Sequence, residues 1–130
     1  MIALDTNVVI RYLTQDDKKQ SLIANKVFEK TLTPNKQGFI SLVVLTEIVW
    51  VLEACYDVNK PNIINIINSL TSSKNLIVEQ SHIVRIATTL FTDKNADFSD
   101  ALIFSIANHA GCEKTLTFDK KAASIGMTKL

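Results

Sequence analysis

The sequence predicts an α/β fold, a three-layer sandwich in which helices flank a central, mostly parallel sheet. Short apolar segments alternate with longer segments at helical spacing, which is the pattern of a parallel sheet covered on both faces. Gly and Pro are scarce, at 3 and 2 of 130 residues, which disfavours both a disordered chain and an all-β chain with many tight turns. Hydrophobic residues make up 47% and charged residues 21%, which is ordinary for a globular protein, so we expect one domain over residues 1–130.

The first third of the chain begins with an apolar segment, Met1–Leu4, which predicts a short buried strand. Val8–Leu13 is apolar enough for one or two helical turns. Asp16 and Asp17 precede a longer helix predicted at Lys18–Leu32, where early acids suit a helix N-terminus. The apolar side chains of this helix that keep helical spacing are Leu22, Ile23, Val27 and Phe28.

The middle of the chain predicts two strands and two helices. Phe39–Ser41 is a strand, and Leu42–Tyr56 is too long for a strand and predicts a buried helix. Pro61 suits the first turn of another helix, whose apolar stripe is strong. The next strand is predicted at Asn75–Glu79.

The last third predicts two helices followed by a strand. Ser81 is expected to cap a helix at His82–Phe91, and Asp97 to cap a helix that begins at Phe98. Glu113–Phe118 predicts the last strand, and the tail that follows it is weakly patterned.

Four acids stand at strand ends or inside apolar segments: Asp5, Glu47, Asp100 and Asp119. Carboxylates in such surroundings are costly to leave unpaired. If they converge at one end of the sheet, a divalent cation such as Mg²⁺ or Mn²⁺ is needed to neutralise them. The chain has no Gly-rich phosphate loop and no Gly-x-Ser-x-Gly motif, whereas acid clusters with metals suit phosphodiester hydrolysis.

Each acid also has a structural explanation when it is taken alone. Asp5 is suited to a turn or cap after a strand, and Glu47 to a helix surface. Asp97 is suited to an N-cap, and Asp100 is favoured by the dipole of the same helix. Asp119 is suited to beginning a turn.

The remaining chemistry-bearing residues predict no second site. His82 and His109 are isolated in the sequence and are expected at the surface or at caps, and Cys55 and Cys112 are expected in the core. The chain has no apolar run of the roughly 18 residues that a membrane span needs, and it lacks a signal peptide, so we expect a cytoplasmic protein. Without the four acids above, nine acids face 14 bases, a balance that suits a polyanionic substrate.

Four segments in order resemble one family. They are Leu4–Thr14 with its Asp5-Thr6-Asn7, Ser41 with Glu47, Asp97–Ile103, and Thr117–Asp119. The chain is similar to PIN-domain nucleases and, more narrowly, to the VapC-type toxins of bacterial toxin–antitoxin pairs. The resemblance extends from Met1 to about Ala123.

This resemblance implies a metal-dependent endoribonuclease that acts on RNA, forms a homodimer and is blocked by a small antitoxin protein. The residues expected to hold Mg²⁺ or Mn²⁺ and to be catalytic are Asp5, Glu47, Asp100 and Asp119. The residues expected to assist them are Asp97, Thr6, Asn7 and Thr117. The residues expected to contact the RNA backbone are Arg11, Lys94, Lys120 and Lys121. Two alternatives remain open: a nuclease of this fold that processes RNA or DNA without an antitoxin, and a non-catalytic interaction module.

Overall fold

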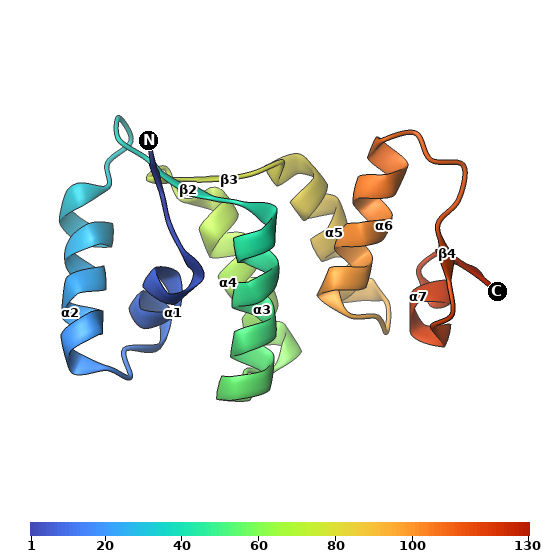
Figure 1. The fold of residues 1–130 in the computed structure, drawn as a ribbon, viewed down its shortest axis with the longest axis horizontal. Helices are drawn as coiled ribbons and strands as arrows, with labels where there is room; N and C mark the ends of the chain where they lie inside the picture. The colour runs from blue at the N-terminus through green and yellow to red at the C-terminus, as the bar shows by residue number, and fades with distance from the viewer. The chain divides into compact units, whose positions relative to one another are not determined.

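The structure, a computed structural model, describes residues 1–130 and divides into two compact units, residues 1–79 and residues 80–130 (Figure 1). The elements of the first unit are β1 (Ile2–Ala3), α1 (Thr6–Thr14), α2 (Lys18–Lys26), a π-helical segment (Val27–Thr31), β2 (Gly38–Ile40), α3 (Leu42–Tyr56), α4 (Lys60–Ser72) and β3 (Leu76–Val78). The elements of the second unit are α5 (Ser81–Asp93), α6 (Phe98–His109), β4 (Leu116–Thr117), α7 (Lys120–Ser124) and β5 (Thr128–Lys129).

The first unit is built on a three-stranded parallel sheet in the order β1-β2-β3. Ile2 pairs with Gly38, and Gly38 pairs in turn with Leu76. Because parallel neighbours end at the same edge, the helices that follow β1 and β2 both begin at that edge. The predicted α/β class with a parallel sheet is confirmed, and this edge positions the acids of the first unit.

Helix α3 occupies the range that the sequence predicts. Ser41 caps it, with its Oγ accepting a hydrogen bond from the Val44 amide at 3.2 Å. Leu45, Ile48 and Leu52 lie on its inner face and are almost fully buried. Burying side chains of this size contributes about 1.5–3 kcal/mol each, so this face anchors the helix in the core.

The second unit contains a helical hairpin and a small parallel sheet. Helices α5 and α6 pack side by side, with the rings of Phe91 and Phe98 in edge-to-face contact at 5.8 Å (Figure 1). Strand β4 pairs in parallel with β5, and α7 connects them. The sequence predicts the first of these strands but not β5, whose two residues are too few to show a period.

The side of α2 that is buried differs from the prediction. Leu22 and Ile23 are both 64% exposed, while Ser21 and Ala24 are buried. The Ser21 hydroxyl donates to the carbonyl oxygen of Arg11 at 3.0 Å, so α2 approaches α1 through its small residues. The apolar stripe expected on this helix is therefore wrong in its first turns.

Two further local expectations are wrong, and a third is confirmed in position. Cys55 and Cys112 are exposed rather than buried. The N-cap of α5 is Gln80, which has a positive φ of 48°, and not Ser81, which is the first helical residue. Asp97 does occupy the N-cap position of α6, although its side chain accepts no capping hydrogen bond. Across the chain, no helix has both the length and the apolar character for crossing a membrane.

Candidate active site

The first unit brings Asp5, Thr6 and Glu47 together across 41 residues of sequence. Asp5 is the N-cap of α1, two residues after β1 ends, and its Oδ1 accepts a hydrogen bond from the Thr6 amide at 2.9 Å. The hydroxyl of Thr6 donates to Oε2 of Glu47 at 2.6 Å. Thr6 is only 6% exposed, whereas both carboxylates are exposed, so a buried hydroxyl orients an accessible carboxylate.

This contact follows from the topology. Parallel pairing of β1 with β2 places the starts of α1 and α3 at the same edge of the sheet, and the two helices pack together. Glu47 lies in the second turn of α3, on the side that faces solvent rather than the core. Asn7, the other polar residue that the motif suggests, is exposed in the first turn of α1.

The same edge carries a further acid, which the sequence analysis did not single out. Glu79 directly follows β3, and its Oε1 accepts a hydrogen bond from the Leu42 amide at 2.9 Å. A carboxylate at this place satisfies a free N–H group at the start of α3 and is favoured by the helix dipole. Its position after an apolar strand was the signal that was overlooked. Its bond to the backbone gives it a structural role.

The second unit brings together three acids. Asp100 lies in the first turn of α6, and Asp119 is the N-cap of α7, where its Oδ1 accepts a hydrogen bond from the Lys121 amide at 3.0 Å. Burial raises the pKa of the Asp100 carboxyl above its ordinary value, and the negative charges of Asp97 and Asp119 raise it further. The ionised Asp100 carboxylate is therefore repelled by both of the other acids.

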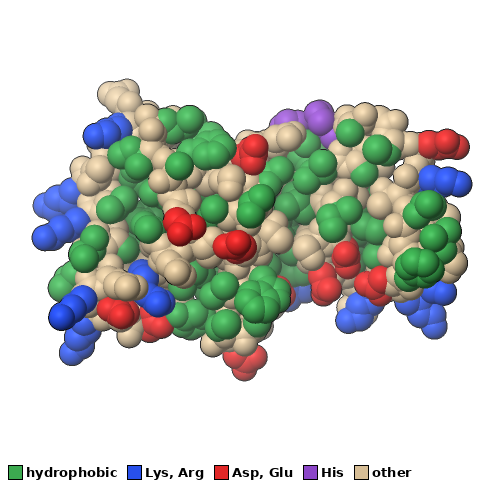
Figure 2. All heavy atoms as spheres, viewed as in Figure 1, with side chains coloured by type: hydrophobic (Ala, Val, Ile, Leu, Met, Phe, Trp, Pro, Cys, Tyr) green, Lys and Arg blue, Asp and Glu red, His purple; other side chains and the backbone are tan.

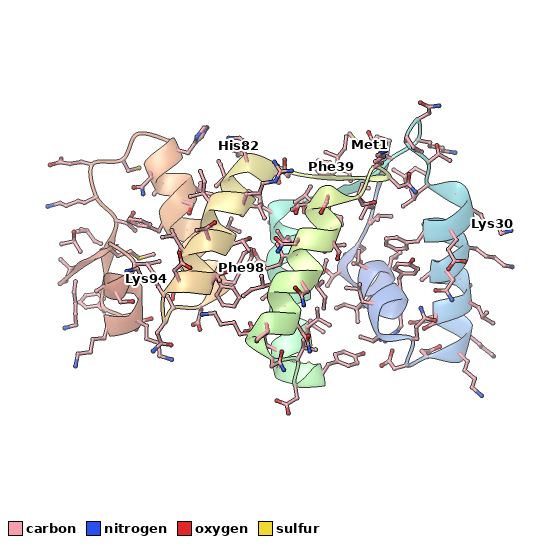
Figure 3. The ribbon with its side chains drawn as sticks, turned by 180° about the vertical axis from the view of Figure 1, so that it is seen from behind. Met1, Lys30, Phe39, His82, Lys94 and Phe98 are labelled. Atoms are coloured by element: carbon pink, nitrogen blue, oxygen red, sulfur yellow. The ribbon has the colours of Figure 1, made fainter.

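Thr117 positions Asp119 through the backbone. Its Oγ1 accepts a hydrogen bond from the Asp119 amide at 3.0 Å, which holds the turn between β4 and α7. Lys120 and Lys121 follow at once and are exposed. Lys94 is exposed just after the end of α5 (Figure 3). The three lysines expected to contact RNA thus all lie on the surface of this unit.

Arg11, the fourth residue expected to contact RNA, is already engaged within the first unit. Its guanidinium donates to Gln20 Oε1 at 2.7 Å, to the Tyr56 hydroxyl at 3.2 Å and to Asp16 Oδ1 at 3.3 Å. Hydrogen bonds from Tyr56 and Thr14 hold the pKa of Asp16 below its ordinary value. This network ties α1, α2 and α3 together, so a role of Arg11 with RNA stays a prediction.

The two histidines are not isolated in the structure. His82 lies in the first turn of α5 (Figure 3), and His109 is the last residue of α6, so the packing of the two helices brings both to the same end of the hairpin. Their rings make an edge contact with centroids 5.1 Å apart, and both are exposed. Spacing along the chain gives no sign of this pair, because the contact depends on the packing of two helices.

The donor atoms of the predicted site suit a hard divalent cation. All four acids offer carboxylate oxygens, which are the preferred ligands of Mg²⁺ and Mn²⁺. Asp5 and Glu47 belong to the first unit, and Asp100 and Asp119 to the second. No group of three or more His, Cys, Asp or Glu side chains is arranged to hold a metal ion in the structure. Convergence of the four acids on one cation therefore stays a prediction.

Comparison with known proteins gives one family. The model of the PIN domain matches residues 2–126, which extends through both units. A VapC ribonuclease of Aquifex aeolicus (strain VF5) is 24% identical over 126 residues, which is 97% of this chain and 93% of that protein. Both matches extend over nearly the whole chain and include the ordered motifs of the sequence. The chain therefore belongs to the PIN domain family.

Proposed function

We propose that this protein is a metal-dependent endoribonuclease and the toxin of a type II toxin–antitoxin pair. The observation that supports the proposal best is the hydrogen bond from the buried Thr6 hydroxyl to the exposed Glu47 carboxylate, directly after Asp5. A glutamate that is only solvated on a helix surface does not need a buried hydroxyl to fix the orientation of its carboxylate. The name of the relative, a VapC ribonuclease, supports ribonuclease activity, and the resemblance of the ordered motifs to VapC-type toxins supports the toxin role.

In this proposal, Asp5, Glu47, Asp100 and Asp119 hold one or two Mg²⁺ or Mn²⁺ ions. When bound, the metal supplies a Lewis acid that neutralises phosphate charge and lowers the pKa of water, so that hydrolysis needs no side-chain nucleophile. The protein's own contribution is to keep the oxygen ligands in place. Ligand orientation by neighbouring hydrogen bonds matters about 10–100-fold in affinity or activity at metal sites.

The residues around the acids have separate tasks. Thr6 restricts the carboxylate of Glu47 to one orientation, and Thr117 holds the backbone that presents Asp119. Asp97 adds negative charge beside Asp100, which increases the need for a cation. Lys94, Lys120 and Lys121 are exposed and, in this proposal, contact the RNA phosphates. Asn7 is the remaining candidate for polar support.

The biological part of the proposal includes partners and location. A homodimer, a cognate small antitoxin protein and a cytoplasmic location belong to it, as does RNA as the substrate. Expression of the protein in a bacterium is expected to arrest growth, and co-expression of the small protein encoded beside it is expected to restore growth. Harmless expression would favour a processing nuclease without an antitoxin.

The deciding experiment is cleavage of total RNA and transfer RNA by the purified protein with Mg²⁺ or Mn²⁺. Discrete products that vanish with EDTA are expected. The Asp100→Asn variant is expected to make none, while Asp93→Asn, which neutralises an exposed acid at the end of α5, retains the activity. Cleavage by Asp100→Asn within a few-fold of the wild type would contradict the assigned role.

A thermal shift separates the nuclease from a non-catalytic interaction module. A ligand that binds only the folded state raises the melting temperature by mass action. We expect Mn²⁺ to raise the melting temperature of the wild type, and Asp5→Asn to lose most of that rise. The interaction module predicts no rise in melting temperature with Mn²⁺, so the absence of a rise in the wild type, together with no RNA cleavage, would favour it.

A further inference from the structure

Helix α3 presents an exposed stripe that includes Glu47. Val43, Glu47, Trp50 and Ala54 follow one another at steps of four, three and four residues, so they lie on one face of the helix, opposite the buried Leu45, Ile48 and Leu52. Val43 is 69% exposed and Trp50 is 65% exposed. Trp50 is the only tryptophan of the chain. The exposed part of the Trp50 side chain does not pack in the core, so core packing does not explain a tryptophan beside Glu47.

Trp50 lies within reach of whatever Glu47 binds. Residues three apart on a helix have Cβ atoms about 5–6 Å from each other. The Glu47 carboxylate is held by Thr6, so it has a fixed position on the face of α3 that also presents Trp50. Figure 2 shows acidic side chains lying among hydrophobic ones on the visible face of the protein.

The second unit shows the same pairing of an acid with an exposed apolar side chain. Phe118 directly precedes Asp119 and is 83% exposed, the highest value among the large hydrophobic residues. Ile103 lies three residues after Asp100 on α6 and is also exposed. An aromatic ring next to a proposed metal ligand therefore occurs in each unit independently.

The α3 stripe is poorly suited to a dry contact with a second copy of the chain. A standard interface buries about 800 Å² per partner, whereas an aromatic side chain supplies about 150–250 Å² and the neighbouring Val43 and Ala54 supply less. Glu47 lies in the middle of the stripe, and charged residues are depleted from interface cores because their burial is costly. A planar nucleobase requires neither a large buried area nor the burial of Glu47, since it contacts only the face of the indole.

We infer that Trp50 is a stacking platform for an unpaired base of the RNA that the protein cleaves, and that Phe118 of the second unit is a further stacking platform of the same kind. The inference rests on the proposed ribonuclease activity and adds to it the residues that hold the nucleobases. Stacking on an aromatic side chain is open to every base, so it positions the strand without selecting a sequence. It also requires that the base be unpaired, because both faces of a paired base are covered by its neighbours in the duplex.

The single tryptophan provides the test. A short unstructured RNA is added to the Asp100→Asn protein in the presence of Mg²⁺ while the fluorescence of Trp50 is recorded. The substitution prevents cleavage of the RNA during the titration. We expect saturable quenching by the single strand and little by the same strand annealed to its complement. Binding of the single strand without any change in Trp50 emission would overturn the inference.

Matched variants extend the test to catalysis. In the otherwise wild-type protein, Trp50→Ala is expected to raise KM about 5- to 150-fold with a smaller change in kcat, since each stacked base contributes about 1–3 kcal/mol to binding. Trp50→Phe is expected to recover part of the loss, and Phe118→Ala to weaken binding in the same direction. The control is Leu22→Ala, which removes an equally exposed apolar side chain from α2 and is expected to change neither constant.

The outcomes separate the inference from the proposed function. Active wild-type protein whose Trp50→Ala variant keeps its KM would overturn the inference and leave the nuclease intact. A Trp50→Ala variant with unchanged RNA affinity and a lower sedimentation coefficient would overturn it as well and would assign the stripe to a second copy. Wild-type protein that neither binds nor cleaves RNA would overturn the proposed function and the inference with it.

Discussion

Replacing Thr6 with Val keeps the shape of a buried side chain and removes the hydroxyl that donates to Glu47 at 2.6 Å. A hydrogen bond to a charged group contributes about 1.5–3 kcal/mol. Because Glu47 is exposed, water replaces part of that bond in the variant. We therefore expect a loss of about 1 kcal/mol or less in the free energy of unfolding, measured by urea denaturation.

The effect of Thr6→Val on cleavage is expected to exceed its effect on stability. The freed Glu47 carboxylate samples several rotamers, and loss of such positioning lowers activity about 10–100-fold at metal sites. The assay is kcat/KM for RNA cleavage at saturating Mg²⁺. This dissociation of activity from stability is the signature of a positioning residue.

Thr6→Ser is the matched variant, because it keeps the hydroxyl and removes one buried methyl group. It is expected to lose about 1 kcal/mol of stability and to keep activity within a few-fold. A double-mutant cycle on stability with Glu47→Gln then isolates the coupling between the two side chains. Additive effects in that cycle, or equal losses of activity in Thr6→Val and Thr6→Ser, would refute the positioning role.

Three further predictions follow from the second unit. Asp100→Asn removes cleavage and raises the melting temperature at neutral pH, since it relieves charge crowding. Because the pKa of Asp100 is raised in the folded protein, its favourable contribution to stability is present below the ordinary pKa of aspartate and is lost as the pH rises through the pKa of the folded state. The rise in melting temperature caused by Asp100→Asn is therefore expected to shrink in acid. Asp97→Asn lowers the pKa of Asp100 by removing a neighbouring charge, so the acid limb of the pH–rate profile moves to lower pH; an unmoved limb would count against that coupling. Gly126→Ala is expected to cost about 1–3 kcal/mol by denaturation, because a Cβ there would come 2.6 Å from the Phe104 ring at a φ of 123°. Gly111→Ala, with a φ of 88° and open space around it, isolates the backbone part, and equal losses in the two variants would exclude the clash.

Local pattern was sufficient for most elements. The helix predicted at Leu42–Tyr56 is α3 residue for residue, because a long apolar segment between Ser41 and Asp57 admits few other structures. Asp97 and Asp119 were predicted near element ends and are N-caps in the structure. These caps depend on neighbours within a turn, so they are readable from the sequence, whereas the cap of α5 at Gln80 has no capping side-chain bond and was missed.

Packing partners were not readable in the same way. Leu22 and Ile23 have the spacing of a core stripe, yet α2 contacts α1 through Ser21 and Ala24 and leaves both larger residues exposed. Periodicity shows that a face exists, but the neighbouring helix decides which face is covered. The His82–His109 contact was missed for the same reason, since it requires the hairpin of α5 with α6.

The α/β class, the family and the acids worth testing follow from the sequence, because apolar alternation and ordered motifs are local properties of the chain. The burial of Thr6, its hydrogen bond to Glu47 and the exposure of Trp50 beside that acid depend on the packing of the folded chain. Parallel pairing of β1 with β2 brings the starts of α1 and α3 to one edge. Neither residues 1–10 nor residues 40–50 alone predict that the two helix starts lie close together, because this proximity arises from hydrogen bonds between strands far apart in the sequence.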